Sequence, residues 1–252
     1  NKVYEFSMKI RHFLYNSFLI ESGNSKIAID PGQNLWIWNL SSLIPETEWK
    51  SITHILITHG DPDHYWQADR VAEASNALVV CGKDLAKVEN DKTLLVDPRG
   101  RGLTSWVPFK NVHPLDIGES VILGDVKIEA VKTVHGPISI PILWFKIKQQ
   151  PGPGERVGIG SVGFKITLDG KTIVNLGDSI LQTEWAGLKP DVLMLPIGGP
   201  GKNTWTMDVS DALEAVKIIA PKKVIPCHYN VPFFLIKNIA SADDQLFKRE
   251  VE

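Results

Sequence analysis

The chain has 252 residues, a hydrophobic fraction of 43% and a formal net charge of −2. No linker rich in serine, glycine or charge divides it, so we expect a single α/β domain over residues 1–252. The near balance of charge argues against a nucleic-acid-binding surface, and no apolar run approaches the ~20 residues that span a bilayer.

The start of the chain has no signal-peptide pattern, and the two cysteines, Cys81 and Cys227, lie in apolar strand-like runs. We therefore expect buried free thiols in a reducing compartment, with the cytoplasm as the location.

The first half of the chain predicts an antiparallel opening and then an alternation of strands and helices. Strands are expected at residues 3–10, 17–22, 26–30, 51–58 and 77–81, and helices from about 64 to 74 and from 83 to 89. Residues 91–112 show no clear period. This alternation favours helices that cover a sheet.

The second half predicts hairpins over residues 120–134 and 162–175, strands at 191–195 and 222–227, and a loop at 149–160. A helix is expected from 207 to 220, with Asp208 as its N-cap, and a short charged helix at 241–252.

Two tryptophans, Trp36 and Trp38, stand in a predicted loop. They indicate either a surface segment that packs on the core or an apolar flap over a site, and the sequence leaves both interpretations open.

The densest group of chemical side chains follows the apolar run 54–57 and reads His59-Gly60-Asp61-Pro62-Asp63-His64. The glycine and the proline force a turn where the strand ends. Imidazole and carboxylate groups together are typical ligands of a hydrolytic metal site.

Three later strand-like runs also end in a potential ligand beside glycine or proline, at His135, Asp178 and His228. One such strand end is weak evidence. Four in order predict that the side chains meet at one edge of a sheet.

This set of motifs resembles the metallo-β-lactamase superfamily of metal-dependent hydrolases, whose first motif is a His-x-His-x-Asp-His cluster. The likeness covers essentially the whole chain and implies a four-layer αββα sandwich with metals at one edge. The segment 16–20 is most similar to the ascorbate-6-phosphate-lactonase-like branch. Two positions depart from these patterns: Asp61 replaces the usual second histidine, and Asn16 stands where that branch often has a nearby histidine.

The resemblance implies two divalent ions. One would take His59, Asp61 and His135, the other Asp63, His64 and His228, and Asp178 would bridge both. The three carboxylates shift the expected preference toward Mn²⁺ or Fe²⁺, with Zn²⁺ still possible. If Asp61 is not a ligand, the site would hold one ion.

The expected reaction is hydrolysis of a small ester, lactone or phosphoester by a hydroxide that bridges the two ions, with Asp63 as the residue that orients it and accepts its proton. Tyr229, Asn230 and Lys202 are candidate substrate contacts. Packing is an equal alternative for Tyr229 and Asn230, and an ordinary turn is the alternative for the loop 198–205 that carries Lys202. We expect His54 to be a buried structural histidine.

Three alternatives stay open: a nuclease of the same superfamily, a carboxylate-rich di-iron redox protein, and a non-catalytic scaffold that metal stabilises. The expected partner is a small-molecule substrate, with no nucleic acid and no membrane. A homo-oligomer is left open.

Overall fold

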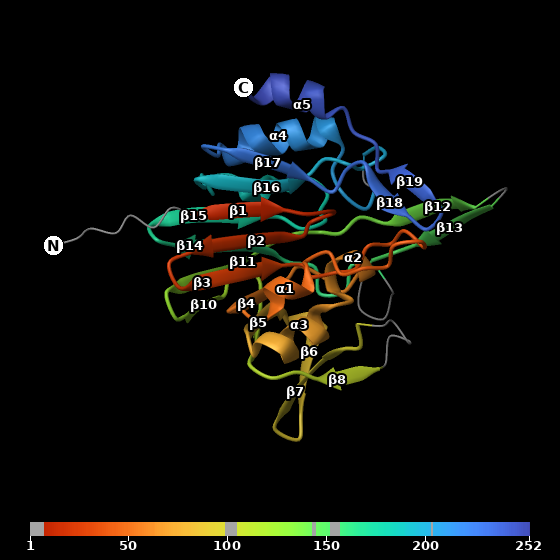
Figure 1. Ribbon diagram of the computed structural model, residues 1–252. Helices are drawn as coiled ribbons and strands as arrows, with labels where there is room; N and C mark the ends of the chain where they lie inside the picture. The colour runs from red at the N-terminus through yellow and green to blue at the C-terminus, as the bar shows by residue number, and fades with distance from the viewer. Residues whose placement is uncertain (1–7, 99–104, 143–144, 152–156, 203) are drawn as a thin grey trace.

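The computed structural model describes the chain except residues 1–7, 99–104, 143–144, 152–156 and 203. Its centre is a pair of six-stranded sheets (Figure 1). The first has the order β1-β2-β3-β4-β5-β9, with β1 at Lys9–His12, β2 at Phe18–Ser22, β3 at Ser25–Ile29, β4 at His54–Ile57, β5 at Leu78–Gly82 and β9 at Val112–Leu115.

The second sheet has the order β10-β11-β14-β15-β16-β17. Its strands are β10 at Ser120–Leu123, β11 at Val126–Val131, β14 at Gly163–Leu168, β15 at Lys171–Asn175, β16 at Val192–Pro196 and β17 at Val224–Cys227. In both sheets antiparallel hairpins give way to parallel strands, from β3 to β9 in the first and from β15 to β17 in the second.

Helices cover the outer faces of the two sheets, which gives the expected αββα layering (Figure 1). α1 (Glu46–Trp49) and α3 (Ala68–Ser75) pack on the first sheet, and α4 (Val209–Ile219) and α5 (Asp244–Val251) pack on the second. Asp208 caps α4 as predicted, because its side chain accepts from the Asp211 N–H. None of the described helices is long and apolar enough to cross a membrane.

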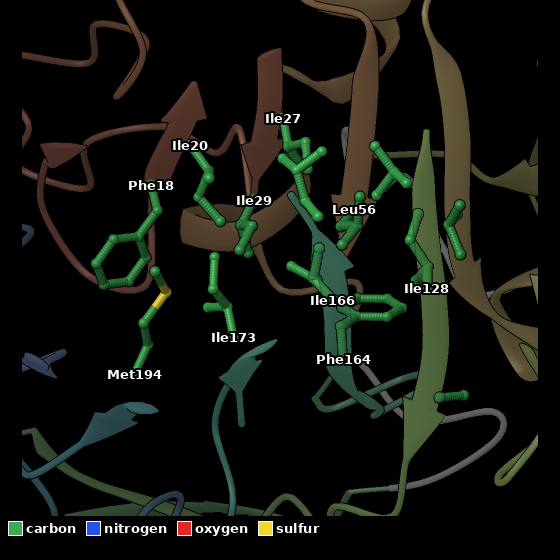
Figure 2. Packing of buried hydrophobic residues seen from close by; sticks show 14 of the residues in the cluster. Phe18, Ile20, Ile27, Ile29, Leu56, Ile128, Phe164, Ile166, Ile173 and Met194 are labelled. Carbon is green, nitrogen blue, oxygen red and sulfur yellow. The ribbon is translucent and has the colours of Figure 1, made fainter. Parts of the chain in front are cut away.

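The core between the sheets is apolar and closed (Figure 2). Phe18, Ile20, Ile27, Ile29 and Leu56 of the first sheet face Ile128, Phe164, Ile166, Ile173 and Met194 of the second, and each of these side chains is fully buried. At ~25 cal/mol per Å² of buried apolar surface, this layer is a main source of stability. It also fixes how the strand ends of one sheet lie relative to those of the other.

Several local predictions were wrong or incomplete. The helix expected near residues 64–74 is two helices, α2 (Pro62–Tyr65) and α3, separated at 66–67. The helix expected at 83–89 is a 3₁₀ turn, Lys83–Leu85, and then β6 (Ala86–Glu89). β6 is a strand because it pairs with β7 (Lys92–Val96), which pairs in turn with β8 (Trp106–Pro108). Residues 3–7 of the first expected strand lie outside the described part.

Two small hairpins were not predicted. β12 (Ile138–Ile142) pairs with β13 (Phe145–Gln149), and β18 (Val231–Phe233) pairs with β19 (Ile236–Ile239). Both lie at the end of the molecule where α2 is found (Figure 1).

Candidate metal centre

The predicted ligands lie beyond the carboxyl ends of strands from both sheets. β4 leads to His59, β11 to His135, β15 to Asp178 and β17 to His228. Since these strands run in the same sense within each sheet, their carboxyl ends meet at one edge. The α2 turn adds Asp63 and His64, with Pro62 as its first residue.

One half of the cluster is formed by His59, Asp61 and His135, all buried. Asp61 Oδ2 lies 3.4 Å from His59 Nε2 and 3.4 Å from His135 Nε2. These three side chains can place their ligand atoms within 4.8 Å of one another, as a shared ion requires.

The other half is formed by Asp63, His64 and His228, which are also buried. Asp63 Oδ2 lies 3.0 Å from His228 Nε2 and 3.3 Å from His64 Nε2. The two groups of three are those expected from the sequence.

Asp178 lies between the two halves. Its Oδ2 is 3.3 Å from His228 Nε2, 3.8 Å from His64 Nε2 and 3.8 Å from His135 Nε2. Gly177 allows this position: its φ is +57°, and an added Cβ would lie 2.7 Å from Thr58 Cβ. The chain after β15 can therefore close directly on the end of β4.

Three of the histidines are oriented by hydrogen bonds at Nδ1, so that Nε2 of each ring faces the cluster. His64 Nδ1 donates to Asp30 Oδ2 at 2.6 Å, and His135 Nδ1 donates to the Gly136 carbonyl at 2.6 Å. His59 Nδ1 lies 3.0 Å from Thr58 Oγ1, which donates its own proton to Asp30. This arrangement fixes the ring tautomers as metal-binding histidines need.

Asp30 is a residue whose importance the sequence did not reveal. Its carboxylate accepts from His64, from the hydroxyl and N–H of Thr58, and from Asn16 Nδ2 at 2.6 Å. The sequence signal for this role was the position of Asp30 between a predicted strand and Pro31-Gly32. In the structure, Asp30 follows β3 and takes a φ of +46°.

Asn16, the second departure from the family pattern, joins both sheets. Its amide donates to Asn175 Oδ1 at 2.9 Å, and its oxygen accepts from Asn175 Nδ2 at 2.9 Å and from Cys227 Sγ at 3.4 Å. With its bond to Asp30, Asn16 therefore connects the first sheet to the ends of β15 and β17. It lies beneath the cluster and carries no free ligand atom toward it.

Asp61 is held by a loop that the sequence suggested only as a connection. Its Oδ1 accepts from the Gly158 N–H at 2.8 Å, which leaves Oδ2 facing His59 and His135. Gly158 has a φ of +62°, and a Cβ there would lie 2.6 Å from His135 Cβ. Asp61 thus has the geometry of a ligand held by an outer hydrogen bond.

The electrostatics of the cluster favour bound positive charge. Burial would raise the pKa of Asp63, but His64 and His228 outweigh it and hold that pKa well below its usual value. Burial would lower the pKa of His64, but Asp63, Asp30 and Asp178 raise it well above its usual value. Ionised carboxylates in a buried site need a cation as a partner.

The residues present fit metal ions. Among the described side chains, His59 Nε2, His64 Nε2 and Asp178 Oδ1 are buried ligand atoms without a hydrogen-bond partner. Buried polar atoms are normally paired, and all three lie where the two halves of the cluster meet. Four imidazoles and three carboxylates suit Zn²⁺, Mn²⁺ or Fe²⁺.

The cluster opens into a pocket of about 230 Å³. Its polar side is formed by Asp61, Asp63, His135, Asp178 and His228. The rest of the described lining is largely apolar and comes from Tyr15, Leu35, Ile138, Ser139, Trp205, Val231, Phe233, Ile236, Ile239 and Ala240. The polar side is therefore a floor under apolar walls.

The three candidate substrate residues do not line this pocket. Tyr229 packs with the apolar residues beneath α4 and α5, which is the packing alternative. Asn230 and Lys202 are both exposed. Their role as substrate contacts therefore stays a prediction, which their positions outside the described lining do not support.

Other predictions concern histidine and tryptophan. His54 is buried and bonded to Thr53 Oγ1 and the Leu123 carbonyl, as expected of a structural histidine. The loop that carries Trp36 and Trp38 contacts β18–β19 beside the pocket, through a bridge between Trp36 and Phe234. The loop therefore lies beside the pocket, and Trp38 is 67% exposed, so whether this loop acts as a flap stays a prediction.

Comparison with known proteins agrees with this geometry. Residues 9–228 match the family described as the beta-lactamase superfamily domain. A "UPF0173 metal-dependent hydrolase" of Pyrobaculum islandicum is 32% identical over 252 residues, covering 97% of this chain and 92% of its own length. One of Desulforamulus reducens is 30% identical over 249 residues, with the same coverage.

Among solved structures, Igni18, a metallo hydrolase from the archaeon Ignicoccus hospitalis, has a TM-score of 0.67 and 26% identity, covering 97% of this chain and 90% of its own. CmlA, a diiron β-hydroxylase from Streptomyces venezuelae, has a TM-score of 0.60 at 15% identity and half of its length covered, a likeness of fold alone.

Proposed function

Because this chain belongs to the metallo-β-lactamase superfamily, within the UPF0173 family of metal-dependent hydrolases, we propose that it hydrolyses a small ester, lactone or phosphoester in the pocket above the His/Asp cluster. The observation that supports this most strongly is that the buried, unpaired ligand atoms of His59, His64 and Asp178 belong to one cluster, whose other members form the floor of an open pocket together with Asp178. A site built only for stability would not need access to solvent.

We propose that His59, Asp61 and His135 hold one divalent ion, that Asp63, His64 and His228 hold a second, and that Asp178 contacts both. Bound there, such ions would lower the pKa of water and stabilise negative charge on the attacked oxygen. Asp63 lines the pocket, and its carboxylate, which lies beside His64 and His228, can orient a water molecule and accept its proton. That proton then passes to the leaving oxygen as its bond to the acyl or phosphoryl centre breaks.

The ascorbate-6-phosphate-lactonase-like branch remains a prediction from residues 16–20. The described part of the pocket lining contains no lysine or arginine, so nothing there supports recognition of a phosphate or a nuclease substrate. The di-iron alternative is tested directly by the identity of the bound metal.

The test begins with protein purified without added metal and analysed by inductively coupled plasma mass spectrometry. We expect about two divalent ions per chain, and turnover of at least one substrate class in a screen of esters, lactones and phosphodiesters. If protein reconstituted with Zn²⁺, Mn²⁺ or Fe²⁺ binds no metal and hydrolyses none of them, the proposal is wrong.

A further inference from the structure

We propose that the substrate is an uncharged ester or lactone with an aliphatic chain. The chain would lie along the apolar wall of the pocket and extend out of its opening. This inference rests on the proposed function and narrows its substrate class. Hydrolysis would form a C–O bond from water to the acyl carbon and break the bond to the alkoxy oxygen, which takes a proton from that water.

The first argument is the composition of the walls. Leu35, Val231, Phe233, Ile236 and Ile239 all face the cavity, opposite the carboxylates and imidazoles. A reactive carbonyl held at the floor would therefore have its substituent among aliphatic and aromatic side chains. Such walls bind methylene groups well and give no partner to a charge.

The second argument is that the apolar surface continues outside the pocket. Ile236 lines the cavity and is still 58% exposed, and the adjoining Phe234 and Leu235 are 53% and 54% exposed. Across from them, Ile37 and Trp38 are exposed by 42% and 67%. We call these five residues the apolar rim.

The rim is built by two segments about 200 positions apart in the sequence. The Phe234 N–H donates to the Leu35 carbonyl at 2.8 Å, and the Ile37 N–H donates to the Phe234 carbonyl at 3.0 Å. These bonds hold the loop against the β18–β19 turn, so wall and rim form one continuous surface. Large exposed apolar side chains lower solubility, so such a patch usually marks a binding surface. Here it would bind the part of a substrate chain that extends out of the pocket.

The third argument concerns charge. The described cation beside the rim is Lys237, whose Nζ lies 4.7 Å from the centre of the Trp36 ring. Lys237 is not among the lining residues, while three carboxylates are. The described walls therefore give no partner to a charge on the part of the substrate that lies away from the floor, which favours a neutral substituent there.

The test compares 4-nitrophenyl acetate, butanoate and octanoate with metal-reconstituted enzyme. We expect kcat/KM for octanoate to exceed that for acetate at least ~tenfold, since one buried methylene is worth about a fourfold gain. Ile236→Ser should reduce the octanoate-to-acetate ratio several-fold. The matched control is Ile122→Ser, because Ile122 is 70% exposed on β10, away from the pocket lining, and should leave both rates unchanged.

A second measurement needs no turnover. Isothermal titration should show 2-decanone binding at least ~tenfold more tightly than 2-butanone, and Ile236→Ser should remove most of the difference. If no ester is hydrolysed, the proposed function is wrong while this titration still decides the inference.

Three results would overturn the inference while hydrolysis stands: equal rates for acetate and octanoate, equal binding of the two ketones, or a preference for an anionic ester. It would also be overturned if the protein were a dimer that Trp38→Ser converts to a monomer, since the rim would then be covered by a second copy.

Discussion

The floor and the walls of the pocket belong to different parts of the molecule. The floor is polar, and its ligands follow strands of both six-stranded sheets. They are fixed by hydrogen bonds such as that from His64 to Asp30 and that from the Gly158 N–H to Asp61. The walls come largely from two hairpins and a loop outside those sheets. A change in a wall can therefore alter which substrate binds without moving the ligands, whereas a change in the floor removes the reaction.

The largest effect should come from the floor. We expect Asp178→Ala or His64→Ala to lower kcat/KM by at least ~10³-fold, equal to ~4 kcal/mol, because each removes a ligand from the centre of the cluster. Bound metal should fall in the same variants. The wall variant Ile236→Ser should keep its full metal content, and wild-type turnover by either floor variant would refute the assignment.

Removal of metal should come next. The ligands belong to both sheets, so an ion that binds only the folded chain at 1,000 times its Kd adds ~4 kcal/mol to the free energy of unfolding. A chelator should remove this added stability, which urea unfolding monitored by tryptophan fluorescence would measure. The same chelator should have much less effect on Asp178→Ala, and an unchanged wild-type midpoint would contradict a metal held between the sheets.

Asp30→Asn tests the support of the floor. The neutral amide is a weaker acceptor for His64 Nδ1–H, so we expect a loss of ~10–100-fold in metal affinity, measured by competition with a chromogenic chelator. Asp169→Asn is the matched control, because Asp169 also accepts from a hydroxyl, that of Ser22, but far from the cluster. Equal affinities for the two variants would mean that Asp30 is not a positioning residue.

The smallest effect should come from a site remote from both regions. Hydrogen bonds from Arg11 and then Lys26 lower the pKa of Glu48 to about 2. A lowered pKa means that this stabilisation is present above the ordinary pKa and is lost as the pH falls toward 2. Glu48→Gln should lower the free energy of unfolding by less than ~1 kcal/mol at pH 7, with the difference from wild type fading below pH 4.

Urea titrations of both proteins from pH 7 to pH 2.5 measure this difference. Metal content and the octanoate-to-acetate ratio should not change in Glu48→Gln, since Glu48 touches neither floor nor walls.

The floor was predictable from sequence because each ligand follows a buried apolar run that glycine or proline ends. The hydrogen bonds that hold these ligands in place were not predictable, since those of Asp30 and Asp61 join segments that no local sequence pattern connects. The walls were also missed: residues 231–239 are largely apolar without a strong turn signal, and their backbone pairing is with each other and with the loop of Trp36. Adjacency to His228 did not decide between the two alternatives for Tyr229, and its place in the apolar cluster beneath α4 and α5 favours packing.

Asn16 has a consequence for how the two sheets stack. Apolar side chains between sheets tolerate small displacements, because one methyl contact is replaced by another. The buried amide of Asn16 does not tolerate such displacements, because it is hydrogen-bonded to Asp30, Asn175 and Cys227. Sliding one sheet by a residue would leave these buried groups without partners, at a cost of ~1–3 kcal/mol each. Asn16 therefore favours one relative position of the two sheets, the one in which ligands from both halves of the chain meet.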